Sequence, residues 1–114
     1  MPYISIETNQ PIDPASNRQL LKKTSAFIAE LLGKPESYVM ISIQPATPLI
    51  FGGSDEPAAF VRLKSIGLPR DRCPELSEKI CRLIEQELGV PKDRIFIDFK
   101  DLARSMFGWN GKTF

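Results

Sequence analysis

The residues with the clearest potential for chemistry stand at the amino terminus, where the chain begins Met1-Pro2 directly ahead of an alternating strand pattern. Processing normally removes an initiator Met before a residue as small as proline, so we expect Pro2 to carry a free secondary amine. Such an amine titrates at about pH 8, and a modest fall in its pKa leaves much of it uncharged at neutral pH. The chain has no His, the usual proton shuttle. Pro2 is therefore a candidate general base, although proline at position 2 alone often reflects only Met removal.

A cation and a strand end could assist such a base. Lys34 follows the glycine that ends a predicted helix. It could lower the pKa of the Pro2 amine and bind an acidic substrate, or it could be a solvated lysine at a helix carboxyl end. Ser65 and Ile66 end a predicted strand just before Gly67, where a freed backbone N–H could bind an anion. Strands often end in glycine, so this signal is weak alone.

Side chains of the last third of the chain could form the walls of a site. Phe96 and Asp98 share one face of the last predicted strand. A carboxylate on that face lies at a rim, in an ion pair or in a site. The tail also supplies apolar side chains that could line an aromatic pocket, with simple packing as the alternative: Met106, Trp109 and Phe114.

Composition limits the class of protein. The 114 residues predict one domain, residues 1–114, with an ordinary 42% of hydrophobic and 25% of charged residues. The net charge of +1 argues against a nucleic-acid binder, and no apolar run predicts a membrane span or a signal peptide. Cys73 and Cys81 fit neither a redox pair nor a four-ligand zinc site, so we expect a reduced, cytoplasmic protein without a cysteine-bound metal. The basic run from Arg62 to Arg72 predicts a solvated face or a surface that attracts anionic substrates.

Hydrophobic periodicity predicts four strands and two helices. Ser16 and Gln19 fit a capping box at the start of the first helix, and Gly33 ends it. Pro74 fits the first turn of the second helix, which Gly89 ends. The strands are predicted at 3–8, 39–43, 58–66 and 95–99, with a Pro- and Gly-rich loop at 45–57 and a tail at 101–114 that has no strong period.

An internal echo, that is, a repeated spacing of Gly and Pro before a strand, relates the two halves of the chain. Gly33-x-Pro35 before one strand matches Gly89-x-Pro91 before another at an offset of 56 residues. The echo predicts two βαβ halves, hence an α+β fold with a four-stranded mixed sheet and both helices on one face. The alternative is that any helix before a strand favours Gly and then Pro. The uncovered face would carry Met40, Phe60 and Phe96, which predicts a homo-oligomer with the apolar tail as a clasp.

The ordered set of motifs resembles the macrophage migration inhibitory factor family of the tautomerase superfamily, along essentially the whole chain. The matching motifs are Pro2, Thr8-Asn9, Gly33-Lys34-Pro35, Phe51-Gly52-Gly53-Ser54, Glu56-Pro57, Ser65-Ile66-Gly67, Pro91-x-Asp93-Arg94, Gly108-Trp109-Asn110 and Thr113-Phe114. The resemblance implies a homotrimer whose sheets surround a central channel. It implies cofactor-free keto–enol tautomerisation of phenylpyruvate-like α-keto acids, or of dopachrome derivatives, with Pro2 as the base. Lys34 and the backbone at Ile66 would hold the substrate carboxylate, and the last strand would come from a neighbouring subunit.

Two departures from the family pattern concern that last strand. Phe96 and Asp98 stand where mammalian members have Tyr and Asn. The loss of a hydroxyl and the gain of a carboxylate predict altered specificity, and Asp98 would raise the pKa of a nearby Pro2 amine. The CxxC of the mammalian cytokines is replaced by residues 58–61, so we expect no thiol–disulfide activity. Two alternatives remain: a cytokine-like binding protein with a vestigial pocket, or a sister hydratase or dehalogenase reaction using Asp98, Arg62 and Arg70.

Overall fold

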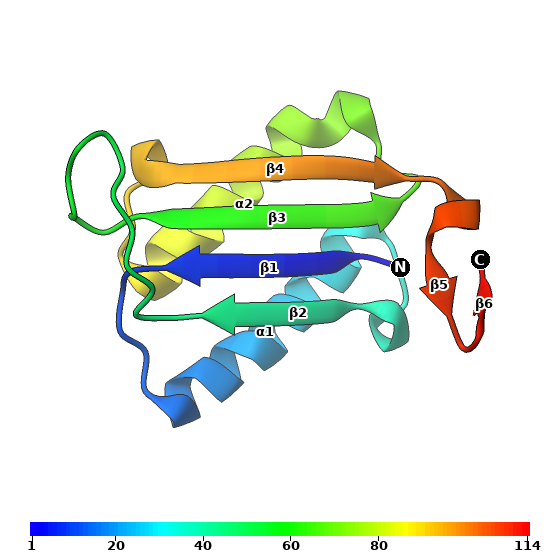
Figure 1. Ribbon diagram of the computed structural model, residues 1–114, viewed down its shortest axis with the longest axis horizontal. Helices are drawn as coiled ribbons and strands as arrows, with labels where there is room; N and C mark the ends of the chain where they lie inside the picture. The colour runs from blue at the N-terminus through cyan, green and yellow to red at the C-terminus, as the bar shows by residue number, and fades with distance from the viewer.

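The computed structural model describes residues 1–114, and one mixed sheet dominates it (Figure 1). Its strands run in the order β2-β1-β3-β4, with β1–β2 and β3–β4 parallel and β1–β3 antiparallel. The four strands are β1 (Tyr3–Thr8), β2 (Met40–Gln44), β3 (Ala59–Ile66) and β4 (Ile95–Leu102). The α+β fold and the four strands are therefore confirmed, with β4 longer at its carboxyl end than periodicity predicted.

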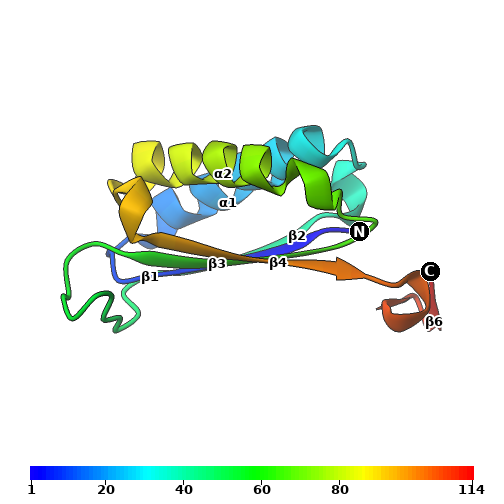
Figure 2. The same ribbon diagram turned by 90° about the horizontal axis from the view of Figure 1, so that it is seen from above.

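Two helices cover one face of this sheet, as Figure 2 shows from above. They are α1 (Pro14–Leu32) and α2 (Cys73–Leu88), and each completes a βαβ half. Both end at a glycine in the left-handed region, Gly33 at φ 64° and Gly89 at φ 67°, as the sequence predicted. None of the helices is long and apolar enough to cross a membrane.

The start of α1 differs from the prediction. Asp13, not Ser16, is the N-cap: its carboxylate accepts a hydrogen bond of 2.9 Å from the backbone N–H of Ser16. Pro14 then occupies the first helical position, where its missing N–H costs nothing and its φ already suits a helix. The Asp-Pro pair therefore starts the helix one turn before the Ser16–Gln19 pattern.

Alternation of side chains across the sheet separates a core from an open face. Ile4 and Ile6 of β1 and Val61 and Leu63 of β3 are fully buried beneath the helices. The opposite face has no covering element within the chain (Figure 2). The strand registers place on it the residues between the core positions, among them the predicted Met40, Phe60 and Phe96 and several polar residues: Ser5, Glu7, Arg62, Lys64, Asp98 and Lys100.

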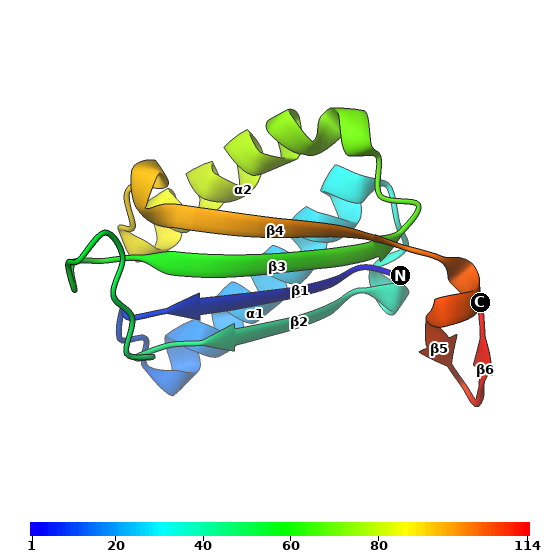
Figure 3. The ribbon, with the colours of Figure 1, turned by 45° about the horizontal axis from the view of Figure 1, so that its top comes forward.

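The tail carries structure that the sequence did not predict. A 3-10 turn at Arg104–Met106 leads into a small hairpin of β5 (Gly108–Trp109) and β6 (Lys112–Thr113). Asn110 and Gly111 have positive φ values of 54° and 73°, which suit a two-residue turn between twisted strands. Figure 3 shows this hairpin beyond the end of the sheet where the amino terminus lies.

Candidate functional site

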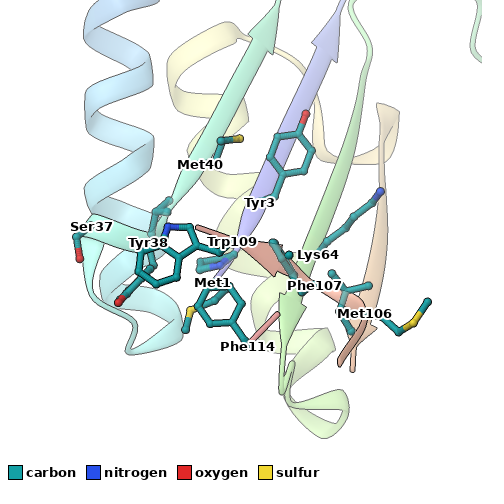
Figure 4. A pocket seen from close by; sticks show the side chains of 14 residues that line it. Met1, Tyr3, Ser37, Tyr38, Met40, Lys64, Met106, Phe107, Trp109 and Phe114 are labelled. Atoms are coloured by element: carbon teal, nitrogen blue, oxygen red, sulfur yellow. The ribbon is translucent and has the colours of Figure 1, made fainter. Parts of the chain in front are cut away.

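A cavity of about 730 Å³ lies at the amino-terminal end of β1 (Figure 4). Its floor comes from the first residues of the chain and the neighbouring strand ends, and its far wall comes from the carboxyl-terminal tail. The residues that line it are Met1, Pro2, Tyr3, Ser37, Tyr38, Val39, Met40, Lys64, Leu102, Met106, Phe107, Gly108, Trp109 and Phe114. Most are apolar, so the cavity suits a ligand with a large apolar part.

The sheet fixes Pro2 at the edge of this cavity. The Pro2 side chain is fully buried, and its carbonyl accepts a hydrogen bond of 3.0 Å from the Met40 backbone N–H. Tyr3, the next residue, pairs with Met40 on one side and with Lys64 on the other. A chain end that enters a central strand directly is held rigidly, as a positioned base requires.

Aromatic rings build one wall. Tyr38 meets the edge of Trp109 at 5.4 Å between ring centroids, and Trp109 stacks on Phe114 at 5.5 Å with 9° between the planes. Phe107 meets Phe114 at 5.8 Å. Tyr38 follows α1, whereas the other rings belong to the tail, and Figure 4 shows them arranged around Met1. The rings therefore attach the tail to the body of the protein and present aromatic surface to a ligand.

The terminal amine lies in an environment that disfavours its charged form. Burial lowers the pKa of the Met1 amine below 8.0, and the positive charge of Lys34 lowers it further. Lys34 is placed there by the end of α1, since its backbone N–H bonds to the Ala29 carbonyl at 2.9 Å immediately after the left-handed Gly33. The cation thus lies close enough to act on the amine, although its side chain does not line the cavity.

The structure brings together some of the predicted site residues. Pro2, Met106 and Phe114 line the cavity. Ser65 and Ile66 end β3 at the same end of the sheet, and Ile66 pairs with Leu102, which lines the cavity. Both residues are buried, with exposed fractions of 1% and 9%.

Phe96 and Asp98 are not brought to this cavity within one chain. Phe96 is at the start of β4, toward the end of the sheet opposite Pro2, and Asp98 is in the middle of that strand (Figure 1). Phe96 packs on Phe51 at 4.7 Å between ring centroids, and Asp98 pairs in register with Arg62. A role for either residue beside Pro2 requires a second subunit, as the family resemblance implies.

Several lining residues were not singled out from sequence as parts of the site. Tyr38 follows the helix-ending Gly-Lys-Pro, and Tyr3 and Met40 become neighbours only through the register of β1 and β2. Lys64 belongs to the basic run of the sequence, and alternation from Leu63 indicates that it is on the open face, but only the register of β1 and β3 places it beside Tyr3. The Asn110-Gly111 pair was the available signal for the hairpin.

Some of the motif residues hold a loop rather than a ligand. The Arg94 guanidinium donates hydrogen bonds to the carbonyls of Phe51, Ser54, Glu56 and Pro57 at 2.8–3.1 Å. The side chain of Asn9 reinforces the same loop, donating to the carbonyls of residues 55 and 56 and accepting from the backbone N–H of residue 58. These motifs therefore fix the loop at the end of the sheet opposite the cavity.

Two βαβ halves in one mixed sheet, with a cavity at the head of the first strand, define the fold of the tautomerase superfamily, and solved structures share it. A macrophage migration inhibitory factor homologue from Prochlorococcus marinus aligns with a TM-score of 0.91 and 48% identity, covering 98% of each chain. The macrophage migration inhibitory factor of Trichinella spiralis aligns with a TM-score of 0.90 and 38% identity, covering 98% of this chain and 99% of that one.

Comparison with known protein sequences leads to the same family as comparison with solved structures. The family model described as macrophage migration inhibitory factor matches residues 1–114. A macrophage migration inhibitory factor homolog from Brugia malayi is 43% identical over 115 residues, covering 100% of this chain and 99% of that protein. The chain therefore belongs to the macrophage migration inhibitory factor family.

Proposed function

We propose that this protein is a cofactor-free keto–enol tautomerase of phenylpyruvate-like α-keto acids, with Pro2 as the base once Met1 is removed. The observation that carries the proposal is the place of the terminus: Pro2 is buried at the edge of an aromatic cavity, where burial and Lys34 lower the pKa of the terminal amine. Removal of Met1 moves the amine one residue inward, to the ring nitrogen of Pro2.

The reaction needs only a proton acceptor and a place for the resulting charge. The uncharged nitrogen of Pro2 takes a proton from the carbon next to the ketone, so a C–H bond breaks, an N–H bond forms and an enolate remains. The same proton then moves to the enolate oxygen, which restores the free amine. In this proposal the aryl group lies against Tyr38, Trp109 and Phe114.

The substrate carboxylate has a place beside the base. Lys34 attracts it, and the backbone at Ser65 and Ile66 offers a further position at the end of β3. Phe96 and Asp98 would complete the pocket from a neighbouring subunit of a homotrimer. Dopachrome derivatives, which combine a ring and a carboxyl group, fit the same arrangement.

The test compares three forms of the purified protein. Mass spectrometry of the wild type should show the loss of one Met, and the enol form of phenylpyruvate should be converted rapidly. A Pro2→Gly variant and a form with residues added before Pro2 should each lose about 10²–10⁴-fold in kcat/KM, the usual contribution of a general base. Both should keep the wild-type circular dichroism spectrum and Tm. Full activity in the extended form would overturn the role of Pro2.

A further inference from the structure

One row of the open face borders the cavity, and it is basic. The strand registers place Met40, Tyr3, Lys64 and Lys100 side by side across β2, β1, β3 and β4. Lys64 lines the cavity and is the only Lys or Arg that does so. In Figure 4 it lies on the opposite side of Met1 from Tyr38 and close to Phe107, with its ammonium group directed along the sheet.

No carboxylate of the chain forms an ion pair with a lysine of this row. The nearest acidic residue on the next row of the face, Asp98, is opposite Arg62, and Arg62 itself donates to Glu7 at 2.7 Å. Asp101 follows Lys100 but accepts a hydrogen bond of 3.1 Å from the Leu68 backbone N–H. Lys64 and Lys100 take part in none of the six ion pairs.

The other cations that the sequence grouped with Lys64 have different surroundings. Arg72 is paired with Glu75 at 3.2 Å on the helix side of the protein, and Arg70 belongs to the exposed 3-10 turn before α2. The basic run is therefore divided among separate surfaces. Of this run, Lys64 alone lines the cavity, and its ammonium group takes part in no ion pair within the chain.

We propose that Lys64 is a second anion-binding residue of this cavity, so that the preferred ligands carry two acidic groups. The inference rests on the proposed function and deepens it: one carboxylate lies beside the terminal amine and Lys34, and the other reaches Lys64 at the open face. The aromatic rings that line the same cavity favour a ring as the connecting part. The substrate class is thus arylpyruvates with a carboxylate on the ring.

The test uses three substrates that differ in one group: phenylpyruvate, 4-carboxyphenylpyruvate and its neutral isostere 4-carbamoylphenylpyruvate. Lys64→Met should reduce kcat/KM for the doubly acidic substrate about tenfold, the size of one charge-assisted hydrogen bond at a partly exposed site. The two singly acidic substrates should change less than about twofold, since they do not use that bond. Lys92→Met removes a lysine that is paired with Glu78 on the surface, and it should change none of the three.

An equal fall for all three substrates would assign Lys64 a structural role and overturn the proposal. No change for any of them would do the same, as would be seen if a neighbouring subunit's carboxylate neutralised the lysine. Turnover of none of them by the wild type would refute the proposed function instead. Calorimetric titration with cinnamate and 4-carboxycinnamate then decides the inference: a preference of about tenfold for the dianion, lost in Lys64→Met, supports it, and equal affinities refute it.

Discussion

At the terminal amine, burial and the charge of Lys34 act in the same direction, because each disfavours the protonated form. The uncharged base is present above the pKa of the amine, which lies below 8.0 in the folded protein. Activity should therefore rise with pH and level off above that pKa. In the proposed mechanism this environment favours an uncharged amine at neutral pH in a chain that has no His.

Lys34→Gln should move this profile to higher pH. Removing the cation lets the amine hold its proton more tightly, so the apparent pKa of kcat/KM rises toward the ordinary value of a terminal amine. Rates below pH 8 should fall more than rates above it, and KM should increase as well, because the substrate carboxylate loses a partner. The measurement is a pH–rate profile with phenylpyruvate, with Lys22→Gln on the exposed side of α1 as the control. An unchanged apparent pKa would remove Lys34 from the electrostatics of the base.

Among the elements, the loop 51–57 is held by two side chains, Asn9 and Arg94. Arg94 reaches four of its backbone carbonyls, a geometry that the planar guanidinium can satisfy and a lysine ammonium cannot. Arg94→Lys should therefore reduce the free energy of unfolding by about 1–3 kcal/mol, the cost of partly buried acceptors left without donors.

Hydrogen exchange offers a local check on the same variant. Amides of residues 51–58 should lose protection in Arg94→Lys, while those of α2 should not. Activity at low temperature should fall only if Phe51 and Phe96 contribute to a neighbouring pocket, since the cavity beside Pro2 is at the other end of the sheet. Unchanged exchange in the loop would show that Asn9 alone is sufficient to hold it.

Elements with a strong period could be predicted from sequence, and short or register-dependent features could not. The alternation around Ile4 and Ile6 predicted β1, and Gly33 and Gly89 marked both helix ends. The two-residue strands β5 and β6 carry no period, so only the turn at Asn110 could have revealed them. The position of Lys64 beside Tyr3 is a property of strand pairing, which no single segment of the sequence encodes.

The residues of the candidate site divide in the same way, into those that the sequence predicts and those that only the folded structure places. Pro2 and the apolar tail residues could be predicted as site residues because their chemistry or composition is unusual. Tyr38 was not, because a tyrosine after a helix has many possible neighbours until the tail is placed against it. The other motif residues, Arg94 among them, could be identified only through the family resemblance. In the structure Arg94 holds a loop.

At the scale of the whole molecule, one chain leaves apolar side chains at both ends of the sheet. Phe96 is 64% exposed and Met40 is 66% exposed. Since the cavity with Pro2 is at one end and Phe96 at the other, a head-to-tail arrangement brings them together, and such heterologous contacts form a ring where the rotation between subunits closes. A homotrimer with its pockets between subunits, as proposed, would cover the apolar side chains at both ends of the sheet.

Mixing of two inactive variants tests that arrangement. Pro2→Gly lacks the base, and Phe96→Ala lacks the side chain that the neighbour would contribute. If subunits are unfolded and refolded together at equal amounts, about a quarter of the pockets combine an intact Pro2 with an intact Phe96, so activity should recover to about a quarter of wild type. Size-exclusion chromatography with light scattering should give three times the chain mass for every sample.

The matched control is a mixture of Pro2→Gly with Lys34→Gln. Both residues lie at the same end of one chain, so no mixed oligomer restores a complete pocket, and the activity should equal the average of the separate variants. Recovery in the first mixture and not in the second would assign Phe96 to the neighbouring subunit. Equal behaviour of the two mixtures would place the whole catalytic apparatus within a single chain, and the exposed Phe96 would then need another explanation.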